Sequence, residues 1–133
     1  MAKLRPSRTL SVAIDRPPAE VYAFAANPEK LPRWSFITSV ALEDGVWRAQ
    51  TPAGTVGIRF VDPNPLGVLD HFVTVGPDNV VYSPMRVISN GAGSEVLFTL
   101  YRLDSMSDED FERDAQTIAG DLAKLKEVLE ASA

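Results

Sequence analysis

The chain has 133 residues, of which 45% are hydrophobic, and its 13 Lys and Arg against 18 Asp and Glu give a formal net charge of −5. This length and composition predict a single folded domain over residues 1–133 with one core. The acidic balance argues against a nucleic-acid partner, because such proteins usually carry a basic face. Cysteine is absent, which excludes disulfides and thiol catalysis.

Histidine occurs only once, at His71, which excludes the two-histidine metal motifs and leaves only an all-carboxylate site open. We therefore expect no metal and no cofactor. No stretch approaches the roughly 18 apolar residues that a membrane span needs. The N-terminus also lacks the apolar segment of a signal peptide, so we expect a cytosolic protein.

The N-terminal part predicts one strand followed by two short helices. Residues 9–14 alternate between apolar and polar side chains, as in a half-buried strand. The proline pair at 17–18 suits the first turn of a helix, and the next Asn-Pro pair ends that helix. A second short turn over residues 28–31 is expected to stop at Pro32 and to lead to Trp34.

The middle of the chain predicts six strands separated by turns rich in glycine, proline and asparagine. The expected strands are residues 37–43, 46–51, 55–61, 68–75, 80–89 and 94–103. Short connections between successive strands favour antiparallel hairpins, because parallel pairs need long crossovers. Together with the first strand, these segments predict a seven-stranded antiparallel sheet.

The C-terminal segment predicts a long amphipathic helix from Asp108 to Glu130. Ser107 and Asp110 resemble a capping box at its start. Apolar residues recur at spacings of four and three and form one stripe: Phe111, Ala115, Ile118, Leu122, Leu125 and Leu129. The sheet is the only surface large enough to bury this stripe. Gly120 lies within the helix, where it either permits close approach to the sheet or is simply tolerated.

This order of elements, with the motifs SVAIDRPPAEVY at 11–22 and NPEKLPRW at 27–34, resembles the START/Bet v 1-like superfamily. Four later stretches resemble its small bacterial polyketide cyclase/dehydrase-like (SRPBCC) members: Asp70-His71, PMRV at 84–87, GSEVLFTL at 93–100 and MSDEDF at 106–111. The resemblance spans nearly the whole chain. It implies an α+β helix-grip fold, in which a curved sheet surrounds the long helix and a cavity lies between them. Because this chain is shorter than many members, that cavity is either small or filled by side chains.

The last predicted hairpin has two alternative registers. A turn over residues 90–93 pairs Met85 with Phe98 on the cavity side and leaves Arg86 and Tyr82 on the outer face. A shift of one residue would turn Arg86 toward the cavity, where it could anchor an anion. We expect the outward arrangement.

Large aromatic side chains are the main candidates for a pocket wall, although aromatics more often fill a core. Trp34 is the first of these, because it follows the helical turns where the resembled family has its cavity mouth. The expected ligand-binding residues are Trp34, Phe36, Trp47, His71, Tyr82, Met85, Arg86, Phe98, Ile118 and Leu122.

His71 is the candidate catalytic residue, as a general acid or base for a bound carbonyl compound. The alternative is a hydrogen-bonded structural histidine. Asp70 cannot orient His71 directly, because adjacent side chains in a strand point to opposite faces. The proline-rich loop over residues 62–67 is expected to be a rigid connection rather than a lid.

Three functions follow from these features, in order of preference. The first is binding of a small hydrophobic or aromatic molecule without catalysis. The second is a polyketide cyclase or dehydratase that uses His71, Arg86 and Tyr82. The third is a protein-interaction module or homodimer. The members of the resembled superfamily include lipid carriers, hormone receptors, aromatase/cyclases and co-chaperone activators, so its fold does not imply one function.

Overall fold

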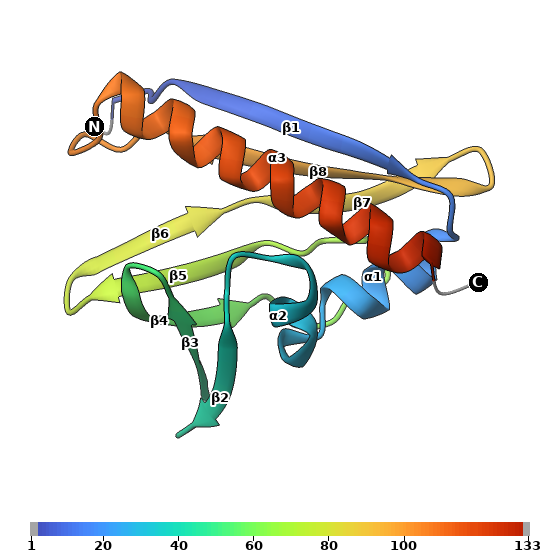
Figure 1. The fold of residues 1–133 in the computed structure, drawn as a ribbon, viewed down its shortest axis with the longest axis horizontal. Coiled ribbons are helices and arrows are strands. Elements are labelled where there is room, and N and C mark those ends of the chain that lie inside the picture. The colour runs from blue at the N-terminus through green and yellow to red at the C-terminus, as the bar shows by residue number, and fades with distance from the viewer. Residues whose placement is uncertain (1–2, 132–133) are drawn as a thin grey trace.

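The computed structural model describes residues 3–131 (Figure 1). The N-terminal elements are β1 (Ser7–Ile14), α1 (Pro18–Ala25), the 3₁₀ turn η1 (Pro28–Lys30) and α2 (Leu31–Trp34). The remaining strands are β2 (Ser39–Glu43), β3 (Val46–Thr51), β4 (Gly54–Phe60), β5 (His71–Gly76), β6 (Asn79–Ser83), β7 (Met85–Asn90) and β8 (Gly93–Tyr101). The long helix α3 (Asp108–Ala131) completes the α+β architecture.

The eight strands of residues 3–131 form two antiparallel sheets, in the orders β1-β8-β7 and β2-β3-β4-β5-β6. The expectation of one seven-stranded sheet is therefore wrong, and the cause lies at Pro84. Proline has no N–H to donate to a ladder, so it divides the expected strand over residues 80–89. Before Pro84, Ser83 pairs with His71 of β5, and after it Met85 pairs with Phe98 of β8.

The segment before β5 holds the two sheets together. The Leu69 N–H donates to the Met85 carbonyl at 2.9 Å, and the Val87 N–H donates to the Gly67 carbonyl at 2.9 Å. Gly67 has a φ of +72°, and a Cβ at this position would lie 2.1 Å from the Val87 carbonyl oxygen. Only glycine permits this close approach of two backbones.

The register of the β7–β8 hairpin agrees with the first of the two alternatives. Met85 pairs with Phe98, and Asn90 pairs with Gly93 at the turn. Met85 and Phe98 are buried at 2% and 8% exposure. Arg86, the next residue along β7, therefore lies on the opposite, outer face.

Prolines occupy the first turn of both short helices. Pro18 begins α1 as expected. We expected Pro32 to end the second helical turn, but this expectation is wrong. Pro32 lies in the first turn of α2, where its missing N–H leaves no helical hydrogen bond unmade. The preceding turn η1 is capped by the Asn27 side chain, which accepts the Glu29 N–H at 3.0 Å.

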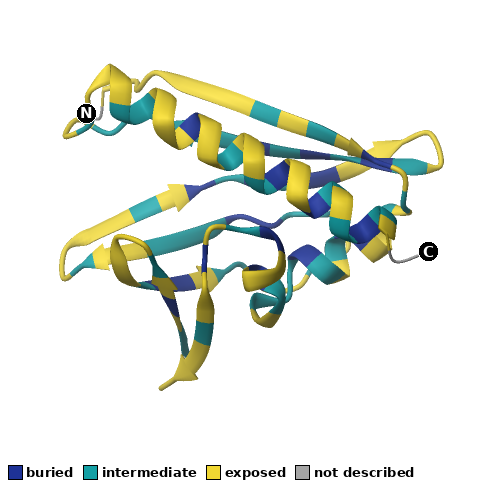
Figure 2. Ribbon diagram, viewed as in Figure 1, coloured by how far each residue is buried: buried dark blue, intermediate teal, exposed yellow. Residues whose placement is uncertain are grey.

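The long helix α3 packs along β1 and β8 and against α2 (Figure 1). The capping box is confirmed, because the Ser107 N–H donates to Asp110 Oδ2 at 3.2 Å and the Asp110 N–H donates to Ser107 Oγ at 3.0 Å. The buried positions of α3 recur along one face (Figure 2): Ala115, Leu122, Leu125 and Leu129. Gly120 is exposed with open space at its Cβ position, so it is tolerated rather than required for packing.

Among the described residues, no helix is both long and apolar enough to cross a bilayer.

Candidate functional site

Two neighbouring pockets share Trp47 as a lining residue. The first, called the α1–β4 pocket here, has a volume of about 250 Å³ and lies between α1, η1, β4 and the loop over residues 61–69. The second is a wider and more open hollow of about 570 Å³ along β2. The α1–β4 pocket is lined by Tyr22, Ala26, Pro28, Gly45, Trp47, Ile58, Arg59, Phe60, Val61, Asp62, Pro63, Val68 and Leu69.

Strand register explains why the apolar wall of the α1–β4 pocket forms. Trp47 of β3 lies directly opposite Ile58 of β4, so the two side chains share a face of the sheet. Phe60 is two residues beyond Ile58 and therefore lies on the same face. On the other side, Tyr22 of α1 and Ala26, the helical-conformation cap that follows α1, are four residues apart, which places them on the same side of the chain.

The loop that closes the pocket is held by one asparagine. Asn64 Oδ1 accepts the N–H groups of Leu66 and Val68 at 3.0 and 3.1 Å. Its Nδ2 donates to the carbonyls of Asp62 and Val68 at 3.1 and 3.0 Å. The Asn64 backbone N–H donates to Tyr22 Oη at 3.1 Å, which ties the loop to α1. These contacts support a rigid connection rather than a lid.

His71 lies on the inner face of the five-stranded sheet, between two aromatic rings. Its ring centroid is 4.9 Å from that of Phe60 and 5.8 Å from that of Phe98. Nδ1 lies 3.0 Å from the Leu69 carbonyl, and because a carbonyl only accepts, Nδ1 carries the proton. Burial lowers the pKa of His71, which favours the neutral ring. His71 does not line either of the two pockets.

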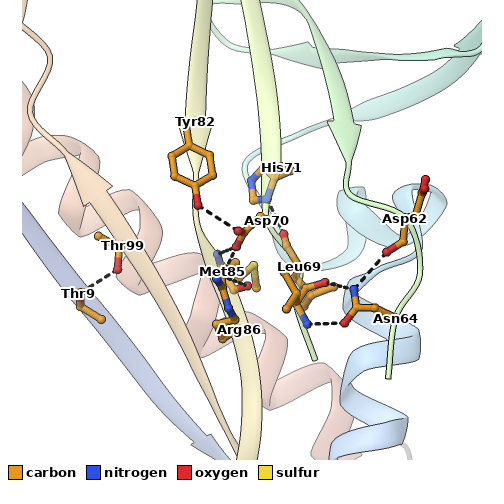
Figure 3. A network of polar contacts seen from close by, with 11 residues as sticks. Thr9, Asp62, Asn64, Leu69, Asp70, His71, Tyr82, Met85, Arg86 and Thr99 are labelled. Atoms are coloured by element: carbon orange, nitrogen blue, oxygen red, sulfur yellow. Dashed lines mark hydrogen bonds and ion pairs between the residues drawn. The ribbon is translucent and has the colours of Figure 1, made fainter. Parts of the chain in front are cut away.

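Adjacent side chains of an extended backbone point to opposite sides, so Asp70 faces away from the His71 ring. Its carboxylate is the centre of a polar network with Tyr82, Met85 and Arg86 (Figure 3). Its Oδ1 accepts the Met85 N–H at 2.9 Å and is also bonded by the Arg86 guanidinium. Its Oδ2 accepts the Tyr82 hydroxyl at 3.0 Å. The carboxylate of Asp70, the residue before β5, thus joins β6 and β7 across the break between the sheets.

The other expected ligand-binding residues do not converge on one site. Tyr82 and Arg86 lie on the outer face, where Arg86 is paired with Asp70 and Tyr82 stacks on Phe72. Phe36 is exposed at 45% and lines neither pocket. The remaining members of the set belong to the core or its margin: Trp34, Met85, Phe98, Ile118 and Leu122. Of the expected ligand-binding residues, Trp47 is the one that lines the α1–β4 pocket.

The stripe of α3 fills space rather than enclosing either pocket. Leu122 and Leu125 are buried at 2% and 0% exposure within the hydrophobic core. In the part of the chain that the structure describes, neither of the two pockets includes a residue of α3.

Asp121 is an ionisable residue that sequence reasoning missed. It is half-buried beside the apolar stripe of α3. Burial raises the pKa of Asp121 from 3.8 to about 7, although a hydrogen bond from the Phe36 backbone lowers this pKa by a smaller amount. The position of Asp121 next to Leu122 is the sequence signal that could have identified it, because a carboxylate at the edge of an apolar stripe is partly removed from water.

We expect Asp121 to reduce stability as the pH rises. Between pH 3.8 and about 7 the folded protein retains a proton that the unfolded chain has lost, so the free energy of unfolding falls over this range. The full pKa difference corresponds to roughly 4 kcal/mol, which solvent screening of a half-buried group reduces to about 2 kcal/mol.

Urea unfolding of wild type and Asp121→Asn at about pH 4 and pH 8 measures this effect. The variant should gain stability over wild type as the pH is raised, and comparison with wild type at each pH removes the contribution of His71. An unchanged difference at the two pH values would show that the Asp121 carboxylate is not desolvated.

Comparison with known proteins establishes the fold. No protein-family model and no curated protein matches the chain. The protein XoxI from Bacillus cereus superposes with a TM-score of 0.76 at 20% identity, over 96% of this chain and 98% of that protein. Ara h 8.0201, which is Bet v 1-like, gives 0.72 at 14% identity over 95% and 98% of the two chains.

The di-domain ARO/CYC BexL from the BE-7585A biosynthetic pathway gives a TM-score of 0.65 at 17% identity, over 93% of this chain and 50% of BexL. The chain therefore has the fold of the START/Bet v 1-like superfamily, as the sequence motifs indicate.

Proposed function

We propose that this protein binds a small apolar or aromatic molecule in the α1–β4 pocket. The observation that carries the proposal is the composition of the pocket, which combines the rings of Trp47, Phe60 and Tyr22 with aliphatic side chains beside two charged residues, Arg59 and Asp62. Small-molecule sites are usually apolar concavities of this kind with a small number of placed polar groups.

The size of the pocket restricts the ligand. Its volume of about 250 Å³ lies just below the roughly 300–1,000 Å³ of ordinary ligand sites. A compact molecule of one or two rings is therefore favoured over a long fatty acid.

Binding without catalysis is favoured over cyclase or dehydratase activity. The cyclase hypothesis is motivated in part by the fold that this chain shares with the ARO/CYC BexL. It requires His71, Arg86 and Tyr82 to act on one substrate. His71 is on the inner face of the sheet, whereas Tyr82 and Arg86 bond Asp70 on the outer face. These three groups do not reach a common molecule.

The proposal is tested by a ligand screen on the full chain, read by thermal shift and by native mass spectrometry. The panel contains one-ring and two-ring aromatics, flavonoids and fatty acids. Compact aromatics should raise the melting temperature by mass action and appear as a bound mass. A panel in which no apolar compound does either would overturn the proposal.

We expect Trp47→Ala to weaken binding of the best compact aromatic at least about tenfold, because removal of the indole exposes apolar ligand surface to water. Isothermal titration calorimetry measures the affinity. Phe36→Ala is the matched control, since this aromatic side chain is 45% exposed and lines neither pocket. If Phe36→Ala weakens binding and Trp47→Ala does not, the ligand site lies near α2 instead.

A further inference from the structure

Tyr22 lines the α1–β4 pocket, and its hydroxyl donates a hydrogen bond to none of the described residues 3–131. Its oxygen accepts the Asn64 N–H at 3.1 Å. A phenol can both accept and donate, so the proton of Tyr22 remains for a second partner. Within residues 3–131, Tyr22 Oη makes no other hydrogen bond.

The position of this hydroxyl is set by the rigid loop rather than by Tyr22 alone. All four hydrogen bonds of the Asn64 side chain go to backbone groups of the same loop, at 3.0 to 3.1 Å. Pro63 and Pro65 restrict the backbone on either side of Asn64. The N–H that holds Tyr22 Oη is therefore fixed before any ligand arrives, and a preorganised donor loses little entropy on binding.

The charges at the pocket favour a neutral acceptor over an anion. Asp62 lines the pocket and would repel a carboxylate. Arg59 also lines it, but its guanidinium lies 5.4 Å from the centroid of the Phe72 ring. Phe72 pairs with Tyr82 on the outer face of the sheet, so the positive charge is directed away from the pocket.

We infer that the α1–β4 pocket selects compact aromatic ketones, with the ligand carbonyl accepting the Tyr22 hydroxyl proton and the rings packing on Trp47 and Phe60. This inference rests on the proposed function, because it names the ligand class of the same pocket. Tyr22 is then the residue that determines specificity, while the aromatic walls supply most of the affinity.

The test uses 1-tetralone and tetralin, which share one bicyclic skeleton and differ by the carbonyl oxygen. Calorimetry measures both with wild type and with Tyr22→Phe. The variant should bind 1-tetralone about five- to tenfold more weakly, the usual effect of losing one hydrogen bond, and should bind tetralin within about twofold of wild type. Retained binding of tetralin shows that the pocket of the variant is folded.

Three other outcomes overturn the inference. Equal losses for both compounds would show that the Tyr22 hydroxyl only positions the loop, and the proposed function would survive. Tighter binding of 1-naphthoate than of 1-tetralone by wild type would show that Arg59, not Tyr22, sets the polarity of the site. Failure of wild type to bind either bicyclic compound would remove the ketone specificity. If the wider panel also fails to bind, the proposed function falls with it.

Discussion

Asp70→Ala should lower the free energy of unfolding by about 3 kcal/mol, because one buried carboxylate serves three partners where the two sheets separate. The substitution leaves the buried Met85 N–H without the acceptor that it has at 2.9 Å, and it removes the acceptor of the Tyr82 hydroxyl. The ion pair with Arg86 contributes little to this loss, since the arginine side chain is 43% exposed and screened by water.

Urea unfolding followed by circular dichroism measures the change. Tyr82→Phe is the matched control, because it removes only one of the hydrogen bonds and should cost about 1 kcal/mol. If Asp70→Ala lowers the free energy of unfolding by less than Tyr82→Phe does, the backbone hydrogen bonds of Leu69 and Val87 alone hold the sheets together.

Leu125→Ala should also destabilise the protein by about 3 kcal/mol. Leu125 is 0% exposed and belongs to the core between α3 and the sheet. Truncation of a leucine in a closely packed core loses the transfer free energy of the side chain and leaves a cavity. Such substitutions usually cost about 2–5 kcal/mol, and we expect ~3 kcal/mol for Leu125.

This measurement decides whether the space beneath α3 is filled or open. Beside an open cavity, the same truncation would lose only the transfer of a partly hydrated side chain, about 1 kcal/mol. Leu66→Ala provides the control, because Leu66 is 75% exposed and its removal should change stability by less than about 0.5 kcal/mol. Similar small values for both leucines would support a cavity against the helix.

The candidate site was much less predictable than the fold. Residue type, as a large aromatic, pointed to Trp47 as a pocket residue, and the structure places it at the wall of the α1–β4 pocket. Tyr22 was present in the motif that indicated the fold, but its role depends on Asn64, which is 42 positions away in the chain. No periodicity carries that information, because the contact joins a helix to a loop.

The outward direction of Arg86 shows what local pairing can determine. A turn of fixed length sets the β7–β8 register, and the register sets which side chains share a face. The function of Asp70 required more, because its partners come from two strands, β6 and β7, that belong to different sheets.

The sequence by itself determined the elements whose causes are local: the capping box at Ser107, the apolar stripe of α3, the proline at the start of α1 and the final hairpin. Each depends on residues a few positions apart, or on a turn of fixed length. Only the tertiary structure decided that Pro84 divides the strands between two sheets and that the pocket lies against α1 rather than α3. Both depend on distant backbones competing for the same partners and on side-chain volumes filling the same space, which no local pattern in the chain records.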